Sequence, residues 1–238
     1  MSGWGILLVV SATAIGAFVQ GSVGFGHNLI AAPAMAFVDD RFVPGPAILG
    51  ATLLTALMLA RDRHGVHLGE VRTALIGRIP ATVLAAATVA FLPERGLAVL
   101  FAVLVLVAVA ISASGAHLRP TTPTLLGAGA LSGFMATTTS IGGPPMAMLY
   151  ANEEGRRMRG TLAGFFLVGS FLSVGALVVA GSFDGESVRL SLLQVPGIAA
   201  GFVASTIGAR RLDAGHTRPA VLAVSVVGAL SVLAKTLL

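Results

Sequence analysis

The strongest constraint on this chain is a set of long stretches without Asp, Glu, Lys or Arg. A helix needs about 20 consecutive apolar residues to cross a bilayer, and these stretches reach that length alone or with their polar flanks. Charged residues make up 11% of the chain, against about a quarter in a soluble domain, and no polar face with helical periodicity interrupts the stretches. The sequence therefore predicts an all-α polytopic membrane protein. The stretches are 42–60, 79–93, 96–118, 160–183, 190–209 and 219–234.

Composition argues against several functional classes. The chain has no cysteine, which excludes disulfides, thiolate metal ligands and cysteine nucleophiles. The spans offer no buried pair of carboxylates and no cluster of histidines, so we expect no enzyme, no metal, no cofactor and no cation carrier. The net charge is +5, but the arginines lie in short loops between apolar stretches, which indicates a lipid bilayer and not nucleic acid. The first segment lacks a basic start and a cleavage site, so it is expected in the mature protein.

Two distant parts of the chain resemble each other. GEVRTALIGRIP (69–80) aligns with GESVRLSLLQVP (185–196) at an offset of 116 residues, and the same offset aligns SVGFG (22–26) with TTSIG (138–142). One ungapped offset shared by two stretches indicates an internal duplication. We therefore predict one integral membrane domain made of two repeats, 1–118 and 119–238.

Each predicted repeat starts with a glycine-rich segment of unusual length. Residues 1–38 and 120–152 carry no Asp, Glu, Lys or Arg, and each segment is too long for one ordinary span and too short for two. A re-entrant helix that breaks and returns fits this length, and so does one long kinked span. Three ordinary spans follow each segment, at 43–60, 70–92 and 96–116, and at 160–181, 187–209 and 218–237.

The arginines favour the re-entrant arrangement. If each glycine-rich segment crosses once, giving eight transmembrane helices, the loops divide the basic residues 6 to 8. If both segments are re-entrant, the division is 10 to 4, and such a bias marks the cytoplasmic side. The repeats are then inverted and both termini are periplasmic. The larger group is Arg61, Arg63, Arg72, Arg119, Arg156, Arg157, Arg159, Arg210, Arg211 and Arg218; the smaller is Arg41, Arg95, Arg189 and Lys235.

The glycine-rich segments predict a ligand site. A break frees backbone N–H and C=O groups, which are tolerated in a membrane only within protein or beside a water-filled cavity. Isolated glycines, such as Gly127, Gly129, Gly164 and Gly169, predict helix packing instead. At QGSVGFGHN (20–28) and TTTSIGGPP (137–145) the returning helices would present N-terminal amides, which bind anions. Broken helices that meet near the bilayer midplane are typical of secondary transporters.

Three side chains add to this anion site. Arg78 lies about 9 Å deeper than Arg72 along one helix, and an intramembrane arginine usually has a function, although it can also snorkel to the interface. Gln194, its partner in the repeat, offers an amide at the matching depth. The reference pKa of histidine lies near neutrality, so His27 could couple the anion to protons; the alternative is a neutral hydrogen-bonding residue.

The motifs GSVGFGHNLIAAP and GFMATTTSIGGPPMAM resemble the paired signatures of the TauE/SafE family of sulfite exporters, and the length and two-half organisation match. His27, Asn28 and Thr137 to Thr139 depart from the family's usual smaller residues. The resemblance implies transport of sulfite, sulfoacetate or related anions across the bacterial inner membrane.

The sequence thus predicts a secondary transporter that exports a small sulfur-containing oxyanion, sulfite or an organosulfonate, by alternating access. A passive anion channel and a carrier of another small organic anion are the alternatives, and substrate, direction, coupling ion and oligomeric state stay open. The predicted substrate-binding residues are Gln20, Gly21, Ser22, Gly24, Phe25, Gly26, His27, Asn28, Arg78, Thr138, Thr139, Ser140, Gly142, Gly143 and Gln194.

Overall fold

The computed structural model describes residues 2–208, and this part of the chain is helical without strands. Two short 3₁₀ turns, η1 (Asp40–Phe42) and η2 (Arg63–Gly65), accompany the α-helices. The predicted span 218–237 and the basic residues Arg210, Arg211, Arg218 and Lys235 lie outside the described residues. The helices are α1 (Gly3–Val23), α2 (His27–Val38), α3 (Gly45–Asp62), α4 (Leu68–Phe91), α5 (Glu94–Ala113), α6 (Thr122–Thr139), α7 (Gly143–Tyr150), α8 (Gly155–Val179), α9 (Gly185–Leu192) and α10 (Val195–Gly208).

The all-helical membrane class is confirmed. Within residues 2–208, α1, α4, α5 and α8 are long and apolar enough to cross a membrane, and α9 with α10 would make a fifth span if counted together. The predicted spans 43–60, 70–92, 96–116 and 160–181 fall on α3, α4, α5 and α8. The predicted span 187–209 is bent by 43° between α9 and α10. Pro196 explains this bend, because proline lacks the N–H that would bond to Leu192 and its ring clashes with that carbonyl.

The first glycine-rich segment forms a helical hairpin. Gly24 ends α1 with φ 110°, and its N–H donates to Gln20 O at 2.7 Å. Gly26 has φ 111°, a conformation that side chains other than glycine rarely adopt. We call residues 24–26 the first break. After it, α2 runs back along α1: a Cβ at Gly16 would come within 2.6 Å of the His27 carbonyl oxygen.

The second glycine-rich segment forms a similar hairpin from α6 and α7. The second break is residues 140–142, and Ser140 has φ 63°. The Ser132 hydroxyl on α6 donates to Gly142 O at 2.6 Å, and Leu125 and Leu149 share one buried cluster, so α7 returns along α6. Both segments therefore double back, and Ser140 stands 116 residues after Gly24, which also has a positive φ.

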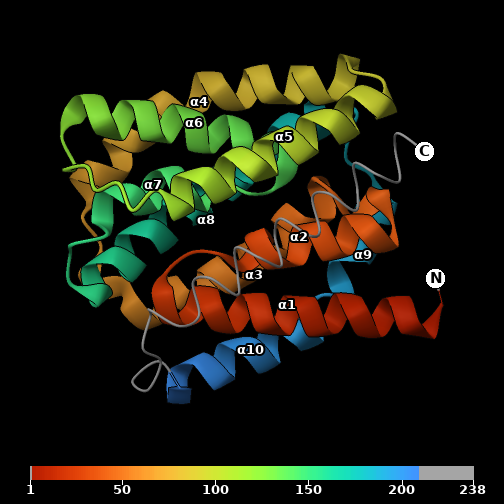
Figure 1. The fold of residues 1–238 in the computed structure, drawn as a ribbon, viewed down its shortest axis with the longest axis horizontal. Helices are drawn as coiled ribbons and strands as arrows, with labels where there is room; N and C mark the ends of the chain where they lie inside the picture. The colour runs from red at the N-terminus through yellow and green to blue at the C-terminus, as the bar shows by residue number, and fades with distance from the viewer. Residues whose placement is uncertain (1, 209–238) are drawn as a thin grey trace.

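The two predicted repeats interleave in the bundle. The first helix of each half packs against a helix of the other half, α1 on α10 and α6 on α4, while α3 packs on α8 (Figure 1). Glycine permits the close approach: a Cβ at Gly201 of α10 would overlap the Ala14 carbonyl oxygen, and a Cβ at Gly129 of α6 would overlap that of Ala74. Packing was the role predicted for Gly129, whereas Gly127 has no neighbour within 4 Å of such a Cβ.

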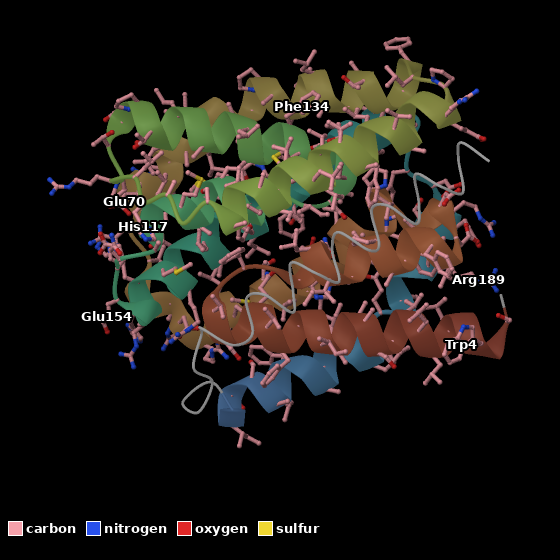
Figure 2. All side chains as sticks on the ribbon, in the orientation of Figure 1. Trp4, Glu70, His117, Phe134, Glu154 and Arg189 are labelled. Carbon is pink, nitrogen blue, oxygen red and sulfur yellow. The ribbon has the colours of Figure 1, made fainter. Side chains whose placement is uncertain are left out.

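Charged residues gather at the two ends of the bundle. Figure 2 shows Glu70, His117 and Glu154 at one end, with Trp4 and Arg189 at the other. At the first of these ends α3 ends and α4 and α8 begin, and Glu70 pairs with Arg157 at 2.7 Å. We call it the arginine-rich end. It carries Arg61, Arg63, Arg72, Arg119, Arg156, Arg157 and Arg159, while the opposite end carries Arg41, Arg95 and Arg189. These are the two groups that the re-entrant arrangement predicts, as far as they are described.

Candidate functional site

The two breaks touch each other inside the bundle. Asn28, at the start of α2, donates from Nδ2 to Ser140 O at 3.0 Å and to Ala47 O at 3.3 Å. A Cβ at Gly143, at the start of α7, would meet the Phe25 side chain at 3.1 Å. Segments more than 100 residues apart in the sequence are thus joined by a buried hydrogen bond.

A cavity of about 50 Å³ lies where the breaks meet. A site of this size has room for a few water molecules or a small ion, because one buried water needs about 10–15 Å³. Six polar side chains, three glycines, one proline and six apolar side chains line it. They are Gln20, Gly26, Asn28, Leu29, Ile48, Ala51, Thr55, Arg78, Ala136, Ser140, Ile141, Gly142, Gly143, Pro144, Phe166 and Ser170.

Among the described residues that line this cavity, Arg78 is the one with a charge. Its side chain is 1% exposed, so it does not snorkel to the interface. Its Nη2 donates to Ser173 Oγ at 3.1 Å, and its guanidinium lies 5.0 Å from the centre of the Phe165 ring. Nε and Nη1 have no hydrogen-bond partner, and none of the ion pairs among the described residues involves Arg78.

Two glycines make space for Arg78 between α6 and α8. A Cβ at Gly133 of α6 would come within 2.7 Å of the Arg78 stem, and a Cβ at Gly169 of α8 would overlap the guanidinium. The sequence predicted a packing role for Gly169, and the structure shows that it packs against the buried cation. Ser173, one turn further along α8, also hydrogen-bonds Thr137 at 2.8 Å, so the guanidinium is held along one edge.

The helix starts at the breaks offer fewer free amides than the sequence suggests. The His27 N–H donates to the Gln20 side-chain oxygen at 3.0 Å, so Gln20 satisfies one amide at the start of α2. Pro144 and Pro145 follow Gly143 in α7 and carry no N–H. Donors for a ligand therefore come chiefly from side chains, with Arg78 as the strongest.

A family profile described as "Sulfite exporter TauE/SafE" matches residues 8–232. The chain belongs to this family. No curated protein and no solved structure matches it. TauE/SafE membership makes it a multi-pass membrane protein from a family of anion exporters, in agreement with the resemblance seen in its motifs.

The structure of this TauE/SafE protein brings seven predicted site residues to the cavity and places the others elsewhere. Those at the cavity are Gln20, Gly26, Asn28, Arg78, Ser140, Gly142 and Gly143. The remaining predicted residues pack around the breaks without lining the cavity: Gly21, Ser22, Gly24, Phe25, His27, Thr138, Thr139 and Gln194.

Several of these outer residues bond to nearby backbone. Ser22 donates to Phe18 O at 2.7 Å, Thr138 to Phe134 O at 2.8 Å and Thr139 to Met135 O at 2.7 Å. The threonines thus form the last turn of α6, and the break begins only at Ser140.

His27 and Gln194 also differ from the expected arrangement. His27 is 1% exposed with neither ring nitrogen hydrogen-bonded, and its Nδ1 would lie 3.0 Å from a Cβ at Gly16 of α1. Gln194 donates to Pro46 O at 2.8 Å and packs against Gly50 of α3. Neither side chain lines the cavity.

Sequence reasoning missed the contribution of α8 in this TauE/SafE chain. Phe166 and Ser170 line the cavity and Ser173 holds Arg78. A signal was present: Gly169, Ser170 and Ser173 are small residues three and four positions apart, so they share one face of a helix. The same pattern also fits helix packing, and the sequence does not show which helix that face meets.

Proposed function

We propose that this protein is a secondary transporter that exports a small sulfur-containing oxyanion, such as sulfite or an organosulfonate, and that the cavity between the two breaks is its binding site. The observation that carries the proposal is the buried Arg78, which lines this cavity and whose Nε and Nη1 have no hydrogen-bond partner among the described residues. An unpaired buried charge costs several kcal/mol. A bound anion offsets that cost and fills the vacant hydrogen-bonding positions, and an arginine suits an oxyanion in geometry as well as charge.

The rest of the lining supports the same ligand class. None of the described residues that line the cavity is a carboxylate, and Ser170 adds a hydroxyl. Both amide hydrogens of Asn28 and the hydroxyls of Thr55 and Ser140 donate to backbone carbonyls, so Arg78 is the main donor for an anion. Its volume of about 50 Å³ favours a compact inorganic oxyanion over an organosulfonate, which needs the site to widen.

The way the halves are joined supports alternating access. Each half supplies one hairpin to the cavity, so movement of one half against the other exposes the site to each side in turn. Only a difference in affinity between the two states drives such a shift. We place the arginine-rich end in the cytoplasm of a bacterial cell, because basic loops stay inside, and the start of α1 at the periplasmic face.

The test measures anion binding to purified protein. Sulfite is expected to raise the melting temperature of the wild-type protein and to leave that of Arg78→Met unchanged. Replacing a buried unpaired cation with an apolar side chain of similar length is neutral or stabilising, so the anion-free variant should melt at the same or a higher temperature. Arg72→Ala, an exposed change on the same helix, is the control and should bind like wild type.

Unchanged sulfite affinity in the folded Arg78→Met protein would remove Arg78 from the site. The alternative function is a passive anion channel, and flux into proteoliposomes distinguishes it from a secondary transporter. Coupled transport depends on the imposed pH gradient, whereas a channel's flux follows only the gradient of the anion itself.

A further inference from the structure

A second, larger cavity opens beside the first break's returning helix. It has a volume of about 520 Å³ and is lined by the end of α2, the η1 turn, the end of α4 and the first half of α5. Charged residues border it where these helices end: Asp39, Asp40, Arg41 and Glu94. The Arg41 side chain is 66% exposed and lies 4.0 Å from Glu186, so this cavity faces the end opposite the arginine-rich end.

The floor of this cavity adjoins the anion site. Thr138 lines the large cavity, while Ala136 and Ser140, two residues away on either side, line the small one. Leu29 and Ile141 line the small cavity, and Phe101 lines the large one. All three belong to one buried hydrophobic cluster. A thin apolar wall, Leu29, Phe101 and Ile141, therefore separates the two cavities.

The arginine-rich end is closed in a different way. Asp62 is 6% exposed and lies between Arg61 at 2.8 Å and Arg159 at 3.3 Å. Arg61 also donates to Gly21 O at 2.6 Å, near the end of α1, and Arg159 packs against Gly24 of the first break. These ionic contacts join α1, α3 and α8 over the first break.

The geometry points to the large cavity as the vestibule of the anion site, and to Leu29, Phe101 and Ile141 as the gate between them. This inference rests on the proposed function. Apolar side chains can rotate aside without leaving a charge unpaired, whereas opening the other end must pull the buried Asp62 carboxylate from two guanidinium groups. The structure is thus closed at the arginine-rich end by ionic contacts, and opening of the apolar gate would connect the anion site with the vestibule at the opposite end.

The absence of native cysteine makes every introduced cysteine the only thiol in the protein. Thr138→Cys in the vestibule should react with a membrane-impermeant maleimide added from the side of the Arg41 end. Ala136→Cys at the anion site should be protected while the gate is intact, and Phe101→Ala should accelerate its modification at least about tenfold, a change that corresponds to about 1.4 kcal/mol in the open population. Ala86→Cys, buried on α4 and lining neither cavity, is the unreactive control.

Three results would overturn the inference: no reaction of Thr138→Cys in a folded protein, reaction only from the arginine-rich side, or equal reactivity of Ala136→Cys with and without Phe101. Where Phe101→Ala reduces the yield of folded protein, Leu29→Ala opens the same wall. The proposed function fails separately, because it requires sulfite to stabilise the wild-type protein. If sulfite stabilises the wild-type protein but Thr138→Cys stays unreactive, only the assignment of the large cavity as a vestibule is wrong.

Discussion

Arg78 in the first half and Gln194 in the second stand 116 residues apart, and each is buried against a glycine of the other half. Arg78 packs on Gly169 of α8, and Gln194 packs on Gly50 of α3. The Gln194 amide nitrogen donates to Pro46 O, whereas Arg78 lines the cavity and its Nε and Nη1 have no hydrogen-bond partner among the described residues. Under the proposed function these two residues have different roles: Gln194 holds a contact between helices, and Arg78 provides a positive charge for the anion.

The test with the largest expected effect replaces each of these two glycines by alanine in a separate variant. Gly169→Ala should displace the guanidinium, which is the movable end of a long side chain, and should weaken sulfite binding at least about tenfold, because a hydrogen bond to a charged group contributes about 1.5–3 kcal/mol. Gly50→Ala should displace the Gln194 amide and lower stability by about 1–3 kcal/mol, as overpacking does, with little effect on affinity. Binding titrations and melting curves on both proteins measure this, and equal losses of affinity would show that both halves supply ligands.

The support of Arg78 gives a second, smaller test. Ser173→Ala removes the acceptor of Nη2, so the guanidinium gains freedom, and we expect affinity for sulfite to fall about tenfold. Thr137→Val acts one bond further away and should lower affinity by less than Ser173→Ala. Ser173→Thr keeps the hydroxyl and should restore binding. If Ser173→Ala changes only the melting temperature and leaves affinity intact, the serine is a packing residue and not a support for the arginine.

The helices and the breaks were predictable from the sequence, because they depend on the contact of each segment with lipid and on its own backbone. Uncharged stretches predict the helices, and clustered glycines predict the doubling back at residues 24–26, because lipid does not satisfy broken backbone. Arg78 was also predicted as a site residue, since an arginine at that depth in a membrane usually has a function. These inferences depend on the environment of one segment at a time.

Contacts between helices were not predictable in the same way. Gly129 and Gly169 look alike in the sequence, yet one meets a backbone carbonyl and the other a guanidinium. Ser170 and Ser173 belong to the site only because α8 lies beside α4. The Thr137–Thr139 run suggested the break itself, but hydroxyls that bond back to carbonyls three and four residues earlier are compatible with a helix, and the helix continues to Thr139.

The two ends of the bundle provide the comparison with the smallest expected effect. At the arginine-rich end, Glu70 accepts from Arg157 at 2.7 Å and from the Tyr150 hydroxyl at 2.9 Å, so it joins α4, α7 and the start of α8. Its side chain is 19% exposed. At the opposite end, Glu186 is 37% exposed and meets Arg189 at 3.4 Å, within one helix.

Neutralising each carboxylate compares the two ends directly. Glu70→Gln should lower the free energy of unfolding by about 1–2 kcal/mol, because it weakens two partly buried hydrogen bonds between helices. Glu186→Gln should change it by less than about 0.5 kcal/mol, the usual effect of an exposed pair. Melting curves in detergent at low and high salt measure both, and salt should screen the second effect further. Equal effects would mean that the arginine-rich end is no more firmly closed than the vestibule end, which removes the reason for assigning the ionic contacts and the apolar wall to different steps of transport.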